Sequence, residues 1–234
     1  MRTIEDTLCE LDPELRKLSL DIHGERDSTR TIVTEQRNKH ALQTTLSFNL
    51  RNGRYFFPFV GARKRTVLMM AARALRRYAH DRLTEFMSSR GFTVTRHYLD
   101  LATAWRAEFK HGVRGRTVGV NAEMDALPGI GHACGHNLIA MAGVGIALAL
   151  RAALEKHDVP GTIVLLGTPG TCPSSDPLCA APLLNAPALV AEESGAGKQI
   201  LLDRGAYKDM DVCIMYVIQP AAPHHCSTCV AMTL

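Results

Sequence analysis

Residues 161–169 read GTIVLLGTP, a run of apolar side chains with almost no polar interruption. A strand without alternation of apolar and polar residues is buried on both faces, which is typical of the middle of a parallel sheet. A helical pattern over 136–156 and a strand pattern over 116–124 precede this run, and a helical pattern over 192–207 and a buried strand over 211–218 follow it. Strands that alternate with helices in this way predict an α/β fold, with a mostly parallel sheet and helices on both faces.

Further elements extend the pattern toward the N-terminus. Leucines at helical spacing predict a helix over 3–20, and residues 62–90 predict another helix that Gly91 ends. FTVTRHYL at 92–99 and TAWRAEF at 103–109 predict two strands. With 46% apolar and 21% charged residues, the chain has the composition of a globular protein that buries a core.

Two segments do not fit this pattern. Residues 24–77 are poorly patterned and basic, with twelve Lys and Arg against three Asp and Glu, although the whole chain carries only +4. Such a span is typical of a solvated surface or an insert. The alternative is a nucleic-acid-binding patch, but the span contains no recognisable binding motif, and we expect no nucleic-acid partner. Residues 170–190, rich in Pro, Ala and Cys, form the second irregular segment.

Several features indicate the compartment. The first residues, MRTIEDTLCELDPELRKL, are charged from position 2 and predict no signal peptide. The seven cysteines are odd in number and irregularly spaced, as expected for free thiols in a reducing environment. The longest strongly apolar run, at 138–150, is interrupted by glycines and falls short of the roughly 20 residues that a membrane span needs. We therefore expect a cytoplasmic protein that does not enter a membrane.

Side chains with metal-binding and acid–base chemistry gather where the predicted strands end. In α/β sheets, sites collect at the carboxyl ends of the strands. Three clusters follow such ends in this chain: Glu123 and Asp125, then His132, Cys134 and His136, and finally Glu192 and Glu193. Their shared position makes them the candidate functional residues.

Cys134 and His136 are separated by a single glycine. Zinc accepts thiolate and imidazole ligands at short bond lengths of roughly 2.0–2.3 Å. Two ligands at i and i+2 converge only where the backbone turns tightly, and Gly135 allows that turn. The first turn of the following helix would favour the thiolate form of Cys134. Taken alone, the pair is also typical of a buried cysteine beside a helix-capping histidine; the neighbouring acidic clusters favour the metal.

Glu192 and Glu193 add the acid–base chemistry that a hydrolytic metal site needs. One of two adjacent carboxylates can bind a metal while the other accepts a proton from a water molecule. Taken alone, the pair is more typical of the acidic first turn of a helix. Asp125 would bridge or orient a metal ligand, or alternatively cap a turn before Pro128.

Other enzyme classes fit less well. The chain contains no GxSxG motif, and ESGAGK, which ends in Lys198, lacks the glycine spacing of a phosphate-binding loop. A Cys134 nucleophile with a histidine base is an alternative, but it leaves the two glutamates without a role.

EMDALPGIGHACGHNLIA at 123–140, GTP at 167–169 with AEESGAGK at 191–198, and GAYKDMDVCIM at 205–215 together resemble a known family. It is the aminoacylase and carboxypeptidase-G class of zinc peptidases, and the chain is most similar to its Xaa-Arg and β-alanyl-lysine dipeptidase members. The resemblance implies hydrolysis of the amide bond of a dipeptide or N-acyl amino acid, with a preference for a basic C-terminal residue. It also implies one or two zinc ions, with manganese as the alternative, and a homodimer.

The same resemblance implies a role for each candidate residue. Cys134, His136 and Glu193 would be metal ligands, Glu192 the general base, and Asp125 an orienting residue. It also divides the chain into an N-terminal helix of the catalytic domain at 1–23, a basic insert at 24–77 and an α/β catalytic core at 78–234 that contains a second insert, 170–190.

The departures from the family pattern lead to a second hypothesis. The family continues into a lid and dimerisation domain and supplies two further histidine ligands, whereas MYVIQP at 215–220 has no histidine and the sequence stops at Leu234. We expect a catalytic domain that is truncated, lacks its lid and is impaired as an enzyme. The alternative is an inactive remnant that binds at most one zinc and acts through protein contacts.

Overall fold

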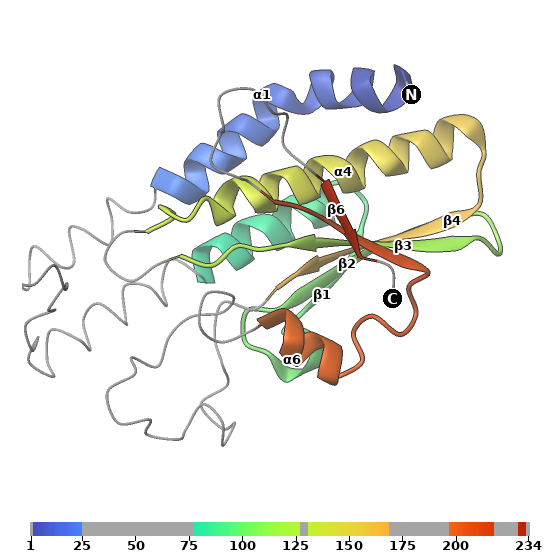
Figure 1. The fold of residues 1–234 in the computed structure, drawn as a ribbon. Coiled ribbons are helices and arrows are strands. Elements are labelled where there is room, and N and C mark those ends of the chain that lie inside the picture. Colours follow the sequence, from blue (N-terminus) through green and yellow to red (C-terminus); the bar gives the residue numbers. More distant parts are fainter. Residues whose placement is uncertain (1, 25–76, 127–130, 169–196, 218–228, 233–234) are drawn as a thin grey trace, which may run out of the picture.

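The computed structural model describes residues 2–24, 77–126, 131–168, 197–217 and 229–232 (Figure 1). All but the end residues of the predicted insert 24–77, and the whole of the predicted insert 170–190, lie outside these ranges. The division into domains therefore stays a prediction. The described residues form one sheet with helices packed against it.

The sheet has six strands in the order β1-β2-β4-β3-β5-β6. Along the chain they are β1 (Thr93–Arg96), β2 (Trp105–His111), β3 (Arg116–Ala122), β4 (Gly161–Gly167), β5 (Val212–Tyr216) and β6 (Cys229–Met232). β3 runs parallel to both β4 and β5, whereas the β1–β2, β2–β4 and β5–β6 pairs are antiparallel. The α/β class is confirmed, but the sheet is mixed rather than mostly parallel.

The lengths of the connections explain the mixed sheet. Parallel neighbours need a crossover of a dozen or more residues, and only residues 97–104 join β1 to β2 and residues 112–115 join β2 to β3. The chain therefore reverses direction at each of these turns. β4, which arrives after a long helix, then enters between β2 and β3, so it is parallel to β3 and antiparallel to β2.

Helices cover both faces of the sheet, as predicted (Figure 1). On one face lie α1 (Arg2–Gly24), a helix over 77–89 and α4 (His136–His157), packed on the side of β4 that carries Ile163 and Leu165. On the other face, α6 (Gly197–Asp203) and the 3-10 turn Tyr98–Asp100 pack on the alternate β4 residues, Val164 and Leu166. Because β4 is buried on both sides, its sequence shows no alternation.

The length of α4 corrects the expectation that this apolar segment is too short to span a membrane. An 18-residue window of this 22-residue helix has a mean hydropathy of 1.8, so by length and composition alone the helix could cross a membrane. The run 138–150 is followed by Arg151 and then by Ala152, Ala153 and Leu154, so the apolar window extends past the run at its C-terminal end. In the structure α4 lies along the sheet, and a side chain at Gly143 would approach Ala122 of β3 at 3.2 Å. These contacts are those of a core helix.

An ion pair between a buried arginine and an exposed aspartate ties the segment after α6 to the sheet and predicts a pH dependence. Arg106 of β2 is buried, and its guanidinium donates to both carboxylate oxygens of Asp209 at 3.2 and 2.5 Å. This hydrogen bond, partly opposed by burial, lowers the pKa of Asp209 below its ordinary value of 3.8. The charged form of Asp209 therefore stabilises the fold above pH 3.8, and this contribution is lost as the pH falls through the lowered pKa.

We expect Asp209→Asn to lower the free energy of unfolding at neutral pH and to weaken its dependence on pH below about 4. Urea unfolding of both proteins between pH 3 and 7 tests this. Asp203→Asn, on the exposed end of α6, is the control. If Asp209→Asn lost as much stability in acid as the parent, the role assigned to Asp209 would be contradicted.

Candidate functional site

The candidate site begins where β3 ends. Glu123 and Asp125 follow the strand directly, and both side chains are buried, with exposed fractions of 4% and 1%. The backbone N–H of Thr168, just after β4, donates to the carbonyl of Ala122 at 3.0 Å, so the ends of the two parallel strands stay together. The sequence pattern predicts the candidate residues at this edge of the sheet.

A tight turn connects this edge to α4. Gly131 and Gly135 have positive φ angles of 67° and 83°, which other residues adopt only at a cost. The N–H of Gly135 donates to the carbonyl of His132 at 3.0 Å and closes the turn. Gly135 is the N-cap of α4, without a side-chain hydrogen bond, and His136 is the first helical residue. His136 therefore does not cap the helix, which contradicts one part of the simpler interpretation made from the sequence.

His136 is held between two buried carboxylates. Its Nδ1 contacts Asp125 Oδ1, and its Nε2 lies 3.2 Å from Glu123 Oε2. Burial alone would lower the pKa of His136, but the hydrogen bonds to Asp125 and to Cys134, with the charges of both partners, outweigh burial and raise it to about 10. The imidazole is thus fixed in orientation and is cationic near neutral pH.

Cys134 belongs to the same turn and directly precedes Gly135. It is half-buried, its thiol is free, and its Sγ lies 3.7 Å from the backbone carbonyl of Asp125. The structure therefore brings together three of the five residues to which the resemblance gives a role: Asp125, Cys134 and His136. Glu192 and Glu193 lie outside the described residues, and their roles stay predictions.

Two further charged side chains complete the cluster. Lys198, at the start of α6, places its Nζ against Glu123 Oε1, and the same Nζ lies 3.9 Å from Met215 Sδ of β5. The sequence had a signal for Glu123, because Glu123 and Asp125 are two residues apart and leave an extended strand on the same side. It had none for the Lys198 contact, since 75 residues separate Lys198 from Glu123.

His132 lies beside this cluster. It is 5% exposed, and neither ring nitrogen has a hydrogen-bond partner within the described part of the chain. Burial, helped by the charges of His23 and His136 and opposed by Asp125, lowers the pKa of His132 to about 4. With His23 of α1 and Leu138 of α4, it lines a cleft of about 400 Å³. His132 is therefore a neutral side chain at the edge of the site.

The donor chemistry of the cluster suits a divalent metal. Thiolate, imidazole and carboxylate are the usual ligands of zinc, and Asp125 Oδ2 is a buried oxygen without a hydrogen-bond partner in the described ranges. Within those same ranges, no three His, Cys, Asp or Glu side chains converge as a ligand set. The described residues therefore fit part of a metal centre, and the predicted third ligand, Glu193, is outside them.

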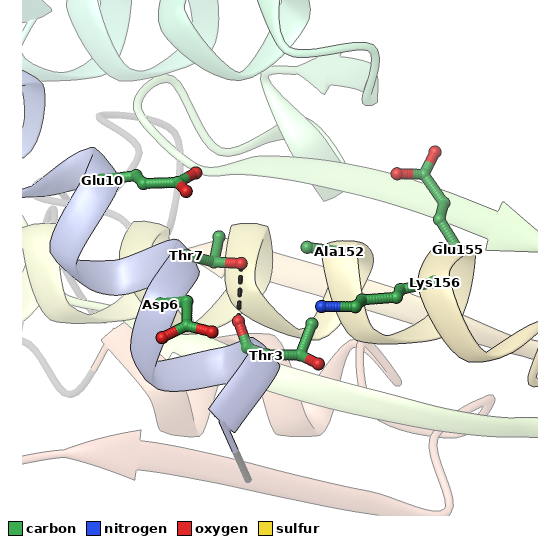
Figure 2. Close-up of a pocket in the computed structure, with 7 residues that line it drawn as sticks. All are labelled: Thr3, Asp6, Thr7, Glu10, Ala152, Glu155 and Lys156. Atoms are coloured by element: carbon green, nitrogen blue, oxygen red, sulfur yellow. Dashed lines mark hydrogen bonds between the residues drawn. The ribbon is translucent and has the colours of Figure 1, made fainter.

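A second hollow, of about 530 Å³, lies between α1 and α4 (Figure 2). It is lined by Asp6, Glu10, Glu155 and Lys156 together with small side chains, and Thr7 donates a hydrogen bond to the carbonyl of Thr3 at 2.7 Å. Glu155 is 19 residues along α4 from His136, which is roughly 28 Å at 1.5 Å per residue. This hollow is separate from the candidate site.

Among curated proteins, the chain is similar to dipeptidases and to a related hydrolase. No family profile matches the chain. The relatives include the Xaa-Arg dipeptidase of Mus musculus, 39% identical over 148 residues, and that of Homo sapiens, 38% identical over 153 residues. One subunit of the p-aminobenzoyl-glutamate hydrolase of Escherichia coli (strain K12) is 27% identical over 156 residues. The predicted resemblance is thereby confirmed: the chain is similar to Xaa-Arg dipeptidases.

The similarity is partial in length. The matches cover 58% of this chain and 29% of the mouse protein, and 59% and 30% for the human protein. The chain thus spans less than a third of the length of the curated relatives it matches. Solved structures similar to the chain include a dinuclear metal-binding peptidase of the M20 family from Bacillus subtilis, with a TM-score of 0.41 and 15% identity over 65% of this chain and 43% of that one.

Proposed function

We propose that the chain contributes the catalytic core of a metal-dependent hydrolase that cleaves the amide bond of dipeptides or N-acyl amino acids. The observation that carries the proposal is the contact between His136 Nδ1 and the buried Asp125 carboxylate, next to Cys134 and at the end of a parallel strand. The similarity to Xaa-Arg dipeptidases supports the same reaction.

In this proposal each residue of the cluster has a defined task. Asp125 accepts a hydrogen bond from Nδ1 of His136, which orients the ring and leaves Nε2 as the nitrogen that would bind a metal. Cys134 offers its thiolate from the other side of Gly135. Glu193 would be the third ligand and Glu192 the base that takes a proton from the attacking water. When bound, zinc, as one or two ions, or manganese would polarise the scissile carbonyl and make water more acidic.

The name of the relatives also suggests the substrate class. We propose dipeptides with a basic C-terminal residue, because the curated relatives are named Xaa-Arg dipeptidases. We further propose that the protein acts in the cytoplasm; the odd number and irregular spacing of the seven cysteines support a reducing environment.

Hydrolysis assays on the full chain test this function. We expect zinc- or manganese-dependent cleavage of dipeptides ending in Arg or Lys, abolished by a chelator and restored by adding the metal back. Cys134→Ser should lose at least about a hundredfold in kcat/KM, since a ligand is removed from the reaction centre. Cys9→Ser, at an exposed cysteine on α1, is the matched control and should retain the parent rate.

Two results would contradict the proposal. Stoichiometric metal binding without hydrolysis of any dipeptide or N-acyl amino acid would favour the inactive remnant. Equal rates for Cys134→Ser and Cys9→Ser would show that Cys134 takes no part in the reaction.

A further inference from the structure

Glu123 is a buried carboxylate that contacts both His136 and Lys198. Its Oε1 contacts Lys198 Nζ, and its Oε2 lies 3.2 Å from His136 Nε2. Only 4% of the Glu123 side chain is exposed, whereas 29% of the Lys198 side chain is. Lys198 thus reaches from the surface at α6 into the interior and meets the carboxylate oxygen that His136 does not contact.

This arrangement conflicts with metal binding unless one contact changes. Asp125 already accepts from Nδ1 of His136, so Nε2 is the nitrogen that His136 has to offer as a ligand. In the described structure Nε2 contacts Glu123. Coordination through Nε2 therefore requires Glu123 to give up its histidine partner.

A buried carboxylate that loses one partner becomes strongly unfavourable unless another cation remains beside it. Lys198 is that cation, and it holds the other carboxylate oxygen. Its ammonium group also lies against Met215 Sδ of β5, and this contact keeps it directed at Glu123 when the histidine is withdrawn.

We propose that Lys198 is a positioning residue that compensates the charge of Glu123 and so allows His136 to give its Nε2 to a metal. The inference rests on the proposed metal-dependent function and extends it to a residue that the predicted metal site does not include. Without Lys198, Glu123 would keep His136 as its only ion-pair partner within the part of the chain that the structure describes, and would compete with the metal for Nε2.

The test compares zinc affinity of the full chain and three variants by competition with a chromophoric zinc indicator. Lys198→Met removes the charge and should weaken zinc binding about 10- to 100-fold, the usual effect of losing an outer partner of a ligand. Lys198→Arg keeps the charge and should bind within about threefold of the parent. Adding Glu123→Gln to Lys198→Met removes the competing carboxylate and should restore most of the affinity.

A second measurement separates this role from a merely structural one. Urea unfolding should show that Lys198→Met lowers the stability of the zinc-loaded chain more than that of the zinc-free chain, in which Glu123 retains His136. An equal loss in both forms would overturn the proposal and leave Lys198 as an ordinary structural residue.

The binding data distinguish two kinds of failure. If the parent chain binds zinc and Lys198→Met binds it equally well, the role of Lys198 is wrong and the proposed function stands. A double variant as weak as Lys198→Met would also overturn this inference alone. If the parent chain itself binds no zinc, both the proposed function and the role of Lys198 are wrong.

Discussion

Replacing His136 with leucine is expected to lower the free energy of unfolding of the metal-free chain by about 3–5 kcal/mol, the usual cost of removing one partner from a buried ion pair. His136 lies between Asp125 and Glu123, whose side chains are 1% and 4% exposed. Leucine would leave Asp125 without its imidazole partner and, among the described residues, would leave Lys198 as the ion-pair partner of Glu123. Urea unfolding in the presence of a chelator measures the loss without any contribution from metal.

The same helix offers a matched control. His157 is the last residue of α4 and is exposed, with a hydrogen bond to the Thr3 hydroxyl at 3.1 Å. His157→Leu should cost less than about 1 kcal/mol. Adding Asp125→Asn to His136→Leu should recover part of the loss, because it removes a buried charge. If His136→Leu were no more destabilising than His157→Leu, the buried cluster would not exist in solution.

Trp105→Ala is expected to destabilise the chain by about 3–5 kcal/mol through the cavity it leaves. Trp105 is fully buried on β2, and its Nε1 donates to Met124 Sδ at 3.3 Å. The indole also lies against Gly167 at the end of β4, where an added Cβ would overlap the ring. Val113→Ala, at a position that is 83% exposed, is the control and should change stability by less than about 0.5 kcal/mol.

The close approach of Gly167 to Trp105 predicts strong non-additivity. Gly167→Ala alone should destabilise by about 1–3 kcal/mol, because it overpacks a rigid ring. In the Trp105→Ala background the added methyl group would enter the cavity, so its cost should largely vanish. Additive effects of the two substitutions in denaturant unfolding would show that the ring does not lie over Gly167.

The fold could be predicted where the sequence pattern is local. GTIVLLGTP and the helical pattern over 136–156 correspond to β4 (Gly161–Gly167) and α4 (His136–His157) within two residues at each end. The order of the strands could not be predicted in the same way. The entry of β4 between β2 and β3 depends on contacts between residues far apart in sequence, and so does the antiparallel pairing that follows from it. β6 (Cys229–Met232) was not predicted; it follows a segment without strand patterning.

In the candidate site, too, the local features could be predicted and the long-range contacts could not. Asp125, Cys134 and His136 lie within twelve residues of one another, and the strand-turn-helix pattern was enough to expect them at one edge of the sheet. The position of Glu123 between His136 and Lys198 depends on how α6 lies relative to the end of β3, which no local pattern encodes. The roles of Glu192 and Glu193 stay predictions made from adjacent carboxylates and from the resemblance.

The central claim is that Cys134 and His136 hold a divalent metal at the end of β3. Titration of the full chain with Co²⁺ tests it most directly, because thiolate coordination produces an intense near-ultraviolet absorption that carboxylate or imidazole ligands alone do not. We predict this band in the parent chain and in Cys9→Ser, and its loss in Cys134→Ser. A chain that developed no thiolate band, or a Cys134→Ser variant that kept it, would contradict the assignment of the metal site.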